Sequence, residues 1–372
     1  MSIGPRVVLL AFDGFPLHAL GRTVTPNLWR LCQEGGFSPE GGRCSLPSTT
    51  YPGFASLLTG AGQWKTGVRT TSHRPGAVPG WAGADRTSLT TIVHAARDAG
   101  LSTAVVMGDQ KLQKVLRLDE MAVAWPPAGV VPDGTELDSF GYPTNAAIRP
   151  YVLAGAEDPD VDLLFVHLNE TDTMGHDLGP NALETIECAH AADTIVGELL
   201  ERIAPDWDRT VIAVVSDHDM GRRLPYLAID PTASLDCVGL VDDWIADGCA
   251  AWLRLAPGAV AHTAISRLSA LNGVEGWRWR EPNILLLLAA PGRTFVAPWI
   301  PANGLHGSAD TARTLAIVGG GHPAVSRIAA SISKRPPRLK DWAPTFADIL
   351  GIELPEAEGM VLMEEPQLQS SG

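Results

Sequence analysis

The stretch that decides the fold is residues 169–180, Asn-Glu-Thr-Asp-Thr-Met-Gly-His-Asp-Leu-Gly-Pro, which follows an apolar run at 163–166. Such a run is typical of a strand that is buried on both faces of a parallel sheet. In an open α/β sheet, ligands bind in the crevice beyond the carboxyl ends of the strands. Asp172 and His176 come together in one turn after this strand and are therefore candidate metal ligands. The ordinary alternative is a glycine-rich loop in which both side chains cap backbone groups.

Two further buried strands end in acidic residues. Residues 7–11, Val-Val-Leu-Leu-Ala, lead into Asp13, and residues 210–215 lead into Ser216-Asp217-His218. A fourth candidate, His306, precedes a strand predicted at 314–318. Each candidate has an ordinary explanation: Asp13 as part of a turn, Asp217 and His218 as a capping pair, and His306 as a hydrogen-bonded loop histidine. These explanations do not account for the common placement of the residues at strand ends.

The candidates together match a binuclear metal centre. A pair of transition-metal ions needs about six protein ligands of mixed oxygen and nitrogen type, arriving from different strand ends, with the ions about 4 Å apart. We predict two groups of three: Asp13, Asp217 and His218 for one ion, and Asp172, His176 and His306 for the other.

The order of predicted elements indicates an α/β fold. Strands predicted at 7–11, 102–107, 162–168, 210–215 and 314–318 are interspersed with helices predicted at 25–35, 88–100, 181–203 and 341–351. This alternation favours a three-layer α/β/α sandwich around a mostly parallel sheet. Residues 108–150, rich in proline, glycine and charge, are interpreted as loops with one short helix.

Residues 225–304 break this rhythm and predict an inserted cap. They combine helix-like segments at 241–247 and 259–271 with strand-like segments at 250–255, 277–279 and 283–289. We therefore expect a catalytic core formed by residues 1–224 and 305–372, with a cap at 225–304 between its two parts.

The composition narrows the class of partner. With 372 residues, of which 45% are hydrophobic, the chain can bury a sizeable core. A formal charge of −14 argues against polymeric DNA or RNA as the partner, because a protein that binds them usually needs a basic surface.

We expect no membrane association, because no run approaches the roughly 18 apolar residues that span a bilayer and the amino terminus does not resemble a signal peptide. Five scattered cysteines, never spaced Cys-x-x-Cys, predict reduced packing residues and a cytoplasmic protein.

A hydroxyl-rich segment offers a nucleophile. Residues 47–60, Pro-Ser-Thr-Thr-Tyr-Pro-Gly-Phe-Ala-Ser-Leu-Leu-Thr-Gly, predict a loop that feeds a short helix starting near Pro52. Thr50 falls at the positive end of this helix, where free N–H groups and the dipole favour an anion such as a phosphate. The alternative is that Ser48, Thr49 and Thr50 compete to cap the helix.

These motifs resemble the alkaline phosphatase superfamily, and most closely its nucleotide pyrophosphatase/phosphodiesterase branch. The likeness extends over nearly the whole chain. Its strongest segments are Asp13-Gly14-Phe15, Pro47-Ser-Thr-Thr-Tyr-Pro52, Asp172-x-x-Gly-His-x-x-Gly-Pro180, Ser216-Asp-His-Asp-Met220 and His306-Gly307.

The resemblance implies a chemistry for these residues. In this superfamily the nucleophile stands two residues before a proline and nine before Thr-Gly, and Thr50 fits both spacings. A sulfatase is disfavoured, because sulfatases carry a cysteine at this position, followed by Pro-Ser-Arg. The expected mechanism is attack by Thr50, itself one of the metal-contacting residues, through a phospho-threonine intermediate at two divalent ions. Zinc suits the Asp/His ligands best, and manganese is the alternative.

The chain departs from the branch where a substrate is expected to bind. Its phosphodiesterases carry an asparagine that holds a phosphoryl oxygen, whereas the corresponding residues 66–71 contain none, so Arg69 and Thr71 are candidate replacements or plain loop residues. Tyr51 is a candidate aromatic platform for a base or ring, with core packing as the alternative. Asp219 replaces a glycine and Ser308 a tyrosine of the family motifs.

Three functions follow from these features. The leading hypothesis is a metal-dependent hydrolase that cleaves a phosphodiester or pyrophosphate bond of a small, nucleotide-like phosphorylated metabolite. The second is a phosphomonoesterase or phosphonate hydrolase on the same scaffold. The third is a non-catalytic protein that binds metal and phosphate, against which the presence of Thr50 speaks, because binding alone needs no nucleophile.

Overall fold

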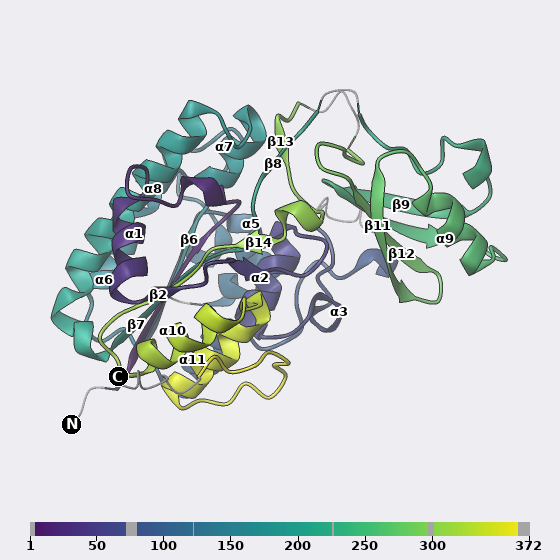
Figure 1. Ribbon diagram of the computed structural model, residues 1–372. Helices are drawn as coiled ribbons and strands as arrows, with labels where there is room; N and C mark the ends of the chain where they lie inside the picture. Colours follow the sequence, from purple (N-terminus) through teal and green to yellow (C-terminus); the bar gives the residue numbers. More distant parts are fainter. Residues whose placement is uncertain (1–3, 72–79, 122, 225–226, 297–300, 364–372) are drawn as a thin grey trace, which may run out of the picture.

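The computed structural model describes residues 4–71, 80–121, 123–224, 227–296 and 301–363 and contains a central seven-stranded sheet (Figure 1). The strand order is β2-β15-β7-β1-β6-β4-β5. Strands β7, β1, β6, β4 and β5 run parallel, whereas β15 and β2 are antiparallel to their neighbours. The strands are β1 (Arg6–Phe12), β2 (Gly36–Phe37), β4 (Thr103–Met107), β5 (Ala124–Trp125), β6 (Leu163–Leu168), β7 (Thr210–Ser216) and β15 (Ala316–Gly319).

The register of the three central strands positions the site. Phe12, at the end of β1, pairs with both Leu168, at the end of β6, and Ser216, at the end of β7. The chain therefore leaves all three strands at the same level, and the residues that follow meet at one edge of the sheet.

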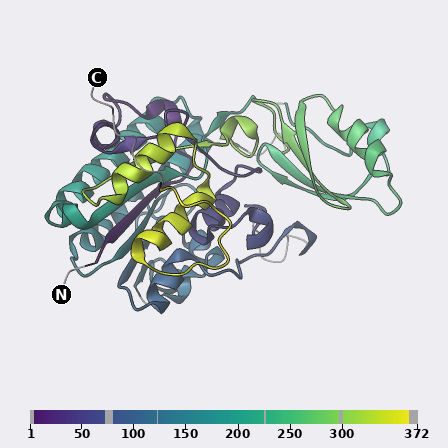
Figure 2. The ribbon, with the colours of Figure 1, turned by 60° about the horizontal axis from the view of Figure 1, so that its bottom comes forward.

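Helices cover both faces of the sheet, which confirms the three-layer α/β/α architecture (Figures 1 and 2). Successive residues of β1 point to opposite faces, so Val7 and Leu9 belong to one apolar core and Val8 and Leu10 to the other. Helices α1 (Pro26–Glu34), α6 (Asn145–Glu157) and α8 (Leu183–Ile203) cover one face. The other face is covered by α2 (Thr50–Thr59), α4 (Ile92–Asp98), α5 (Gln110–Val115), α10 (Ala324–Lys334) and α11 (Trp342–Leu350).

A second, four-stranded sheet stands beside this core in both views (Figures 1 and 2). Its strands β9 (Val241–Asp247), β10 (Ala250–Leu255), β11 (Val274–Glu281) and β12 (Ile284–Ala289) pair antiparallel in the order β11-β12-β10-β9. We call it the inserted sheet, because it lies within the residues predicted to form an insertion. Helix α9 (Ala261–Ser269) packs on one face. Trp252 and Leu286 on the other face pack with Trp64 and Trp81, which belong to the segment between α2 and α4.

Short elements complete the connections between these parts. Two small antiparallel pairs are formed by β3 (Gly42–Arg43) with β14 (Arg313–Thr314), and by β8 (Gly221–Arg222) with β13 (Gly304–Leu305). The remaining α-helices are α3 (Gln63–Thr66) and α7 (Glu170–Leu178).

Two local predictions were wrong. Residues 241–247 were expected to be helix-like, but they form β9, because pairing with β10 satisfies their backbone and outweighs a weak local preference. Residues 108–150 contain α5, β5 and the start of the 13-residue helix α6, not loops with one short helix. Pro150 stands inside α6, which is capped by the Thr144 hydroxyl and held by burial of Ile148 and Val152.

None of the helices in the described ranges combines the length and the apolar character that crossing a membrane requires.

Helix α8 offers a matched test of the core facing α1 and α6. Leu199 is fully buried, whereas Leu183, at the start of the same helix, is 68% exposed. Leu199→Ala should lower the free energy of unfolding by about 2–5 kcal/mol, because it removes buried methyl groups and leaves a cavity. Leu183→Ala should change it by no more than about 0.5 kcal/mol. Urea denaturation of both variants measures the difference, and equal losses would contradict the described packing.

Candidate active site

The residues predicted from the three strand ends lie together. Two groups of possible ligands form at the carboxyl edge of the central sheet, and within each group one ligand atom per residue lies within 4.8 Å of the others. The groups are Asp13, Asp217 and His218, and Asp172, His176 and His306.

Helix α7 sets the geometry of the second group. Residues 170–178 form a helix and not a loop, so Asp172 and His176 stand one turn apart on the same face. Their Oδ2 and Nε2 atoms are 3.4 Å apart. Gly14, with a φ of +55°, lets Asp172 approach β1, because a Cβ there would lie 2.6 Å from Asp172 Oδ1.

The hydrogen bonds of the three histidines fix their tautomers. His176 Nδ1 donates to Gly304 O at 2.9 Å, His306 Nδ1 to Ser48 O at 3.0 Å, and His218 Nδ1 to the Asp219 carbonyl at 3.1 Å. A carbonyl only accepts, so the proton of each neutral ring is on Nδ1 and Nε2 presents a lone pair.

These lone pairs face one another. The Nε2 atoms of His176 and His306 are only 3.2 Å apart. Two lone pairs at this distance repel each other, and a cation between them removes the repulsion. Metal-binding histidines characteristically use the same arrangement, with the other ring nitrogen donating to a carbonyl.

Three buried carboxylates add to this demand for positive charge. Asp13, Asp172 and Asp217 are at most 7% exposed. Asp172 Oδ1 and Asp217 Oδ2 are buried and accept no hydrogen bond from any described residue. Burial raises the pKa of Asp172 to about 7 and those of Asp13 and Asp217 well above their usual range. Burial likewise lowers the pKa of His218 to about 3. Both effects favour the uncharged forms, and a divalent cation would reverse this balance for the carboxylates.

Thr50 lies against the first of these groups. It is the first residue of α2, it is 5% exposed, and its Oγ1 is 3.3 Å from His218 Nε2 and 3.4 Å from Asp13 Oδ1. The preceding Thr49 is the N-cap residue, and its side chain makes no capping hydrogen bond. The positive end of a ten-residue helix therefore lies at the Thr50 hydroxyl.

His167 is a site residue that sequence reasoning missed. Its ring is fully buried, and its Nε2 lies 3.2 Å from Asp13 Oδ2, on the other carboxylate oxygen from the one that Thr50 contacts. Phe54 packs edge-on against the ring. The available signal was a histidine within the apolar strand β6, directly opposite Ala11 in the register of β1. His167 thereby orients the Asp13 carboxylate.

The Thr71 side chain contacts the start of α2, at the residue that follows the predicted nucleophile. Its Oγ1 accepts a hydrogen bond from the Tyr51 N–H at 3.1 Å. The Tyr51 side chain does not form an open platform, which corrects that expectation. It is only 3% exposed, packs into the core, and hydrogen-bonds to Tyr142, and burial raises the pKa of its phenol.

The Arg69 side chain, the other candidate for binding a phosphate, contacts residues outside the two groups of candidate ligands. Its guanidinium lies 3.6 Å from the centre of the Trp64 ring, donates to Trp81 O at 3.2 Å, and is 3.7 Å from the Glu281 carboxylate of β11. Its carbonyl accepts from the Trp252 indole. Arg69 therefore joins the segment between α2 and α4 to the inserted sheet.

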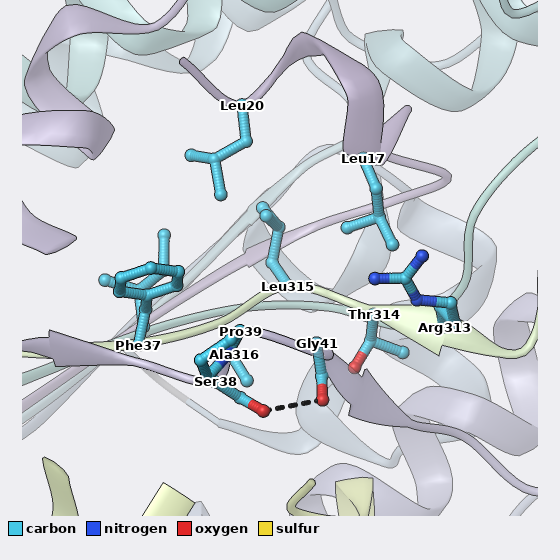
Figure 3. Close-up of a pocket in the computed structure, with 11 residues that line it drawn as sticks. Leu17, Leu20, Phe37, Ser38, Pro39, Gly41, Arg313, Thr314, Leu315 and Ala316 are labelled. Atoms are coloured by element: carbon cyan, nitrogen blue, oxygen red, sulfur yellow. Dashed lines mark hydrogen bonds between the residues drawn. The ribbon is translucent and has the colours of Figure 1, made fainter. Parts of the chain in front are cut away.

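Two cavities lie apart from the six candidate ligands. Arg222 and Arg223 line a cavity of about 290 Å³ beyond the end of α7, together with Asn181 and Asn303. Figure 3 shows an apolar cavity of about 130 Å³ in which Leu17, Leu20, Phe37 and Leu315 converge. Neither cavity is lined by a candidate ligand.

Asp219 and Ser308, which replace a glycine and a tyrosine of the family motifs, have local structural roles. Asp219 Oδ1 accepts from the N–H groups of Leu17 and Met220, at 3.3 and 2.8 Å. Ser308 donates its hydroxyl to Asp310. Both substitutions therefore support turns next to the candidate ligands.

Comparison with known proteins gives this arrangement a family. Residues 7–225 match the model of the type I phosphodiesterase / nucleotide pyrophosphatase family. The chain belongs to this family. The match includes Thr50 and five of the six candidate ligands, and it confirms the resemblance drawn from the sequence motifs.

Similar solved structures confirm the architecture. Human ectonucleotide pyrophosphatase/phosphodiesterase 5 superposes with a TM-score of 0.70 at 16% identity, over 95% of this chain and 97% of that one. An inactive form of the murine protein, solved in complex with AMP, gives 0.66 at 16% identity, over 96% and 97%. An uncharacterized pyrophosphatase/phosphodiesterase of Schizosaccharomyces pombe is 24% identical over 273 residues, which are 64% of this chain. The chain spans about half the length of that relative.

His306→Ala tests whether the second group holds a metal ion. Loss of one of three donors should lower bound zinc from about two ions per chain to about one. Elemental analysis of the zinc-loaded, dialysed protein measures this. His262→Ala, on the exposed side of α9, is the control and should retain the full zinc content. Unchanged zinc in His306→Ala would overturn the ligand assignment.

Proposed function

We propose that this protein hydrolyses a phosphodiester or pyrophosphate bond of a small, nucleotide-like substrate, with Thr50 as the nucleophile. The observation that carries the proposal is the position of the Thr50 hydroxyl, 3.3 Å from His218 Nε2 and 3.4 Å from Asp13 Oδ1, at the positive end of α2. Family membership supports the reaction class, and the AMP complex of the murine relative supports a nucleotide-like substrate.

The two groups of candidate ligands would hold two divalent ions. The mixture of carboxylate oxygens and imidazole nitrogens suits zinc, with manganese as the alternative. When bound, such ions supply Lewis-acid stabilisation of charge on the reacting oxygens. The residues present fit this role. Asp172 Oδ1 and Asp217 Oδ2 are buried without a hydrogen bond from the described residues, and the Nε2 atoms of His176 and His306 lie 3.2 Å apart.

The chain's own residues supply the nucleophile and its orientation. The Thr50 hydroxyl gives up its proton to solvent as its oxygen forms a bond to phosphorus. The bond from phosphorus to the leaving oxygen breaks on the opposite side, and that oxygen keeps the electron pair and takes up a proton from solvent. Water then hydrolyses the phospho-threonine and restores the hydroxyl. The helix dipole of α2 favours the negative phosphoryl oxygens beside Thr50, and His167 keeps Asp13 in place.

The distribution of cations favours a diester or pyrophosphate over a monoester. A monoester is a dianion, and its extra charge is usually met by a fixed guanidinium or ammonium. In the described part of the chain, no arginine or lysine forms an ion pair with a candidate ligand, and Arg69 is held by Trp64 and Glu281. Arg222 and Arg223 line the separate cavity beyond α7.

Thr50→Ala tests the nucleophile. The hydroxyl contributes the attacking oxygen and little packing, so kcat should fall by several orders of magnitude, or about 4 kcal/mol or more. Zinc content and thermal stability should remain close to those of the unmodified protein. Thr50→Ser, which keeps a hydroxyl, is the matched control and should retain measurable turnover. Undiminished activity in Thr50→Ala would exclude Thr50 as the nucleophile.

A substrate panel tests the reaction class. For zinc-loaded protein, kcat/KM for bis-p-nitrophenyl phosphate should exceed that for p-nitrophenyl phosphate by at least about tenfold, or 1.4 kcal/mol. A monoester advantage of about a hundredfold, or 2.7 kcal/mol, would favour the phosphomonoesterase alternative. Release of phosphate from phosphonoacetate would favour a phosphonate hydrolase. Binding of AMP without turnover of any substrate would favour the non-catalytic alternative.

A further inference from the structure

The turn between β9 and β10 brings the inserted sheet to the candidate active site. Asp247 and Ala250 pair across this turn, which contains Gly248 at a φ of +64°. The Cys249 N–H donates to His306 O at 2.7 Å. A Cβ on Gly248 would collide with His306 O, and one on Gly307 would lie 2.6 Å from Asp247 O. The turn therefore lies directly against the backbone that carries the candidate ligand His306.

The same turn carries a buried carboxylate that belongs to neither group of metal ligands. Asp247 is 4% exposed. The Thr49 hydroxyl donates to its Oδ2 at 3.1 Å, the Thr71 N–H lies 3.3 Å from both oxygens, and the Thr70 side chain also hydrogen-bonds to it. Within the described ranges no arginine, lysine or histidine forms an ion pair with Asp247. The hydrogen bonds from Thr49, Thr70 and Thr71 offset the free-energy cost of burying the Asp247 carboxylate.

These contacts hold the chain on both sides of Thr50. Thr49 precedes Thr50 and is bound to Asp247 directly. Tyr51 follows Thr50, and its N–H donates to Thr71 Oγ1, while the N–H of Thr71 is bound to Asp247. One carboxylate therefore fixes Thr49 directly and Tyr51 through Thr71. Thr50 lies between Thr49 and Tyr51, so the position of its hydroxyl depends on the Asp247 carboxylate.

We propose that Asp247 is a positioning residue of the inserted sheet, which holds the start of α2 so that the Thr50 hydroxyl keeps its place beside Asp13 and His218. The inference rests on the proposed function of Thr50. A displacement of about 1 Å in a reacting group is enough to cost about a hundredfold in rate. Asp247 touches none of the reacting atoms itself, and its role acts through Thr49 and Thr71. The inserted sheet thereby contributes to the placement of the nucleophile.

Asp247→Asn tests this role, because the Thr71 N–H lies 3.3 Å from both carboxylate oxygens. Whichever way the new amide turns, its NH₂ therefore faces this N–H and cannot accept from it. In zinc-loaded protein, kcat for bis-p-nitrophenyl phosphate should fall about a hundredfold, with KM within about threefold and zinc content unchanged. Asp242→Asn is the matched control on the same strand, since Asp242 is exposed and pairs with Arg254. It should keep the kcat of the unmodified protein.

Substitutions at Thr49 separate positioning from folding. Thr49→Val removes the hydroxyl at nearly constant shape and should lower kcat at unchanged zinc content, whereas Thr49→Ser keeps the donor and should restore kcat. In the double variant Thr49→Val/Asp247→Asn, the loss in kcat should be smaller than the product of the single losses, because both changes remove one interaction. These Thr49 variants decide the question if Asp247→Asn does not fold.

Each contrary result has a distinct meaning. A kcat unchanged in both Asp247→Asn and Thr49→Val would overturn the positioning role and leave the proposed function standing. A loss in kcat that merely follows a loss of zinc or of folded protein would show a structural role for Asp247 and would also overturn the inference. An unmodified protein that turns over none of the phosphate esters would overturn the proposed function, and this inference with it.

Discussion

Three carboxylates buried at one edge of a parallel sheet are the constraint on which the rest of the site depends. Asp13, Asp172 and Asp217 meet because β1, β6 and β7 end at the same level. Like charges at this proximity, away from water, are stable only with compensating positive charge or with protons. The surrounding residues are arranged for a positive charge. Each histidine of the two groups directs its Nδ1 proton to a backbone carbonyl and the lone pair of its Nε2 towards the other candidate ligands.

Local sequence predicted the parts of the site that lie next to strand ends. Apolar runs followed by Asp13, by Asp172 and by Asp217 identify buried strands and their exits, and a parallel sheet brings such exits together. Thr50 was a candidate from its place at the start of a short helix, and its role as the nucleophile was implied by the spacing in the family that the motifs resemble. The architecture followed from the alternation of strands and helices, whereas β9 was predicted as a helix because its pairing with β10 cannot be read from residues 241–247 alone.

The contacts that sequence could not predict are those made by residues distant in the chain. Asp247 reaches Thr49 across 198 residues, and nothing around it marks it as different from the other acids of β9. His167 meets Asp13 because two parallel strands share a register. Arg69 lies close in sequence to the expected phosphate site, but Trp64 and the inserted sheet bind its guanidinium. Proximity along the chain is therefore a weak guide to substrate contacts here.

The bond from His306 Nδ1 to Ser48 O spans 258 residues, and this separation has a consequence for biosynthesis. The ring that completes the second group is made long after the loop that orients it. At about 5–20 residues per second, a ribosome needs on the order of ten to fifty seconds to travel from one to the other. During this interval the nascent chain already carries Asp13 and Thr50 but lacks the last imidazole. A complete set of candidate ligands consequently exists only after residue 306 has been translated, and a chain interrupted before His306 carries an incomplete set.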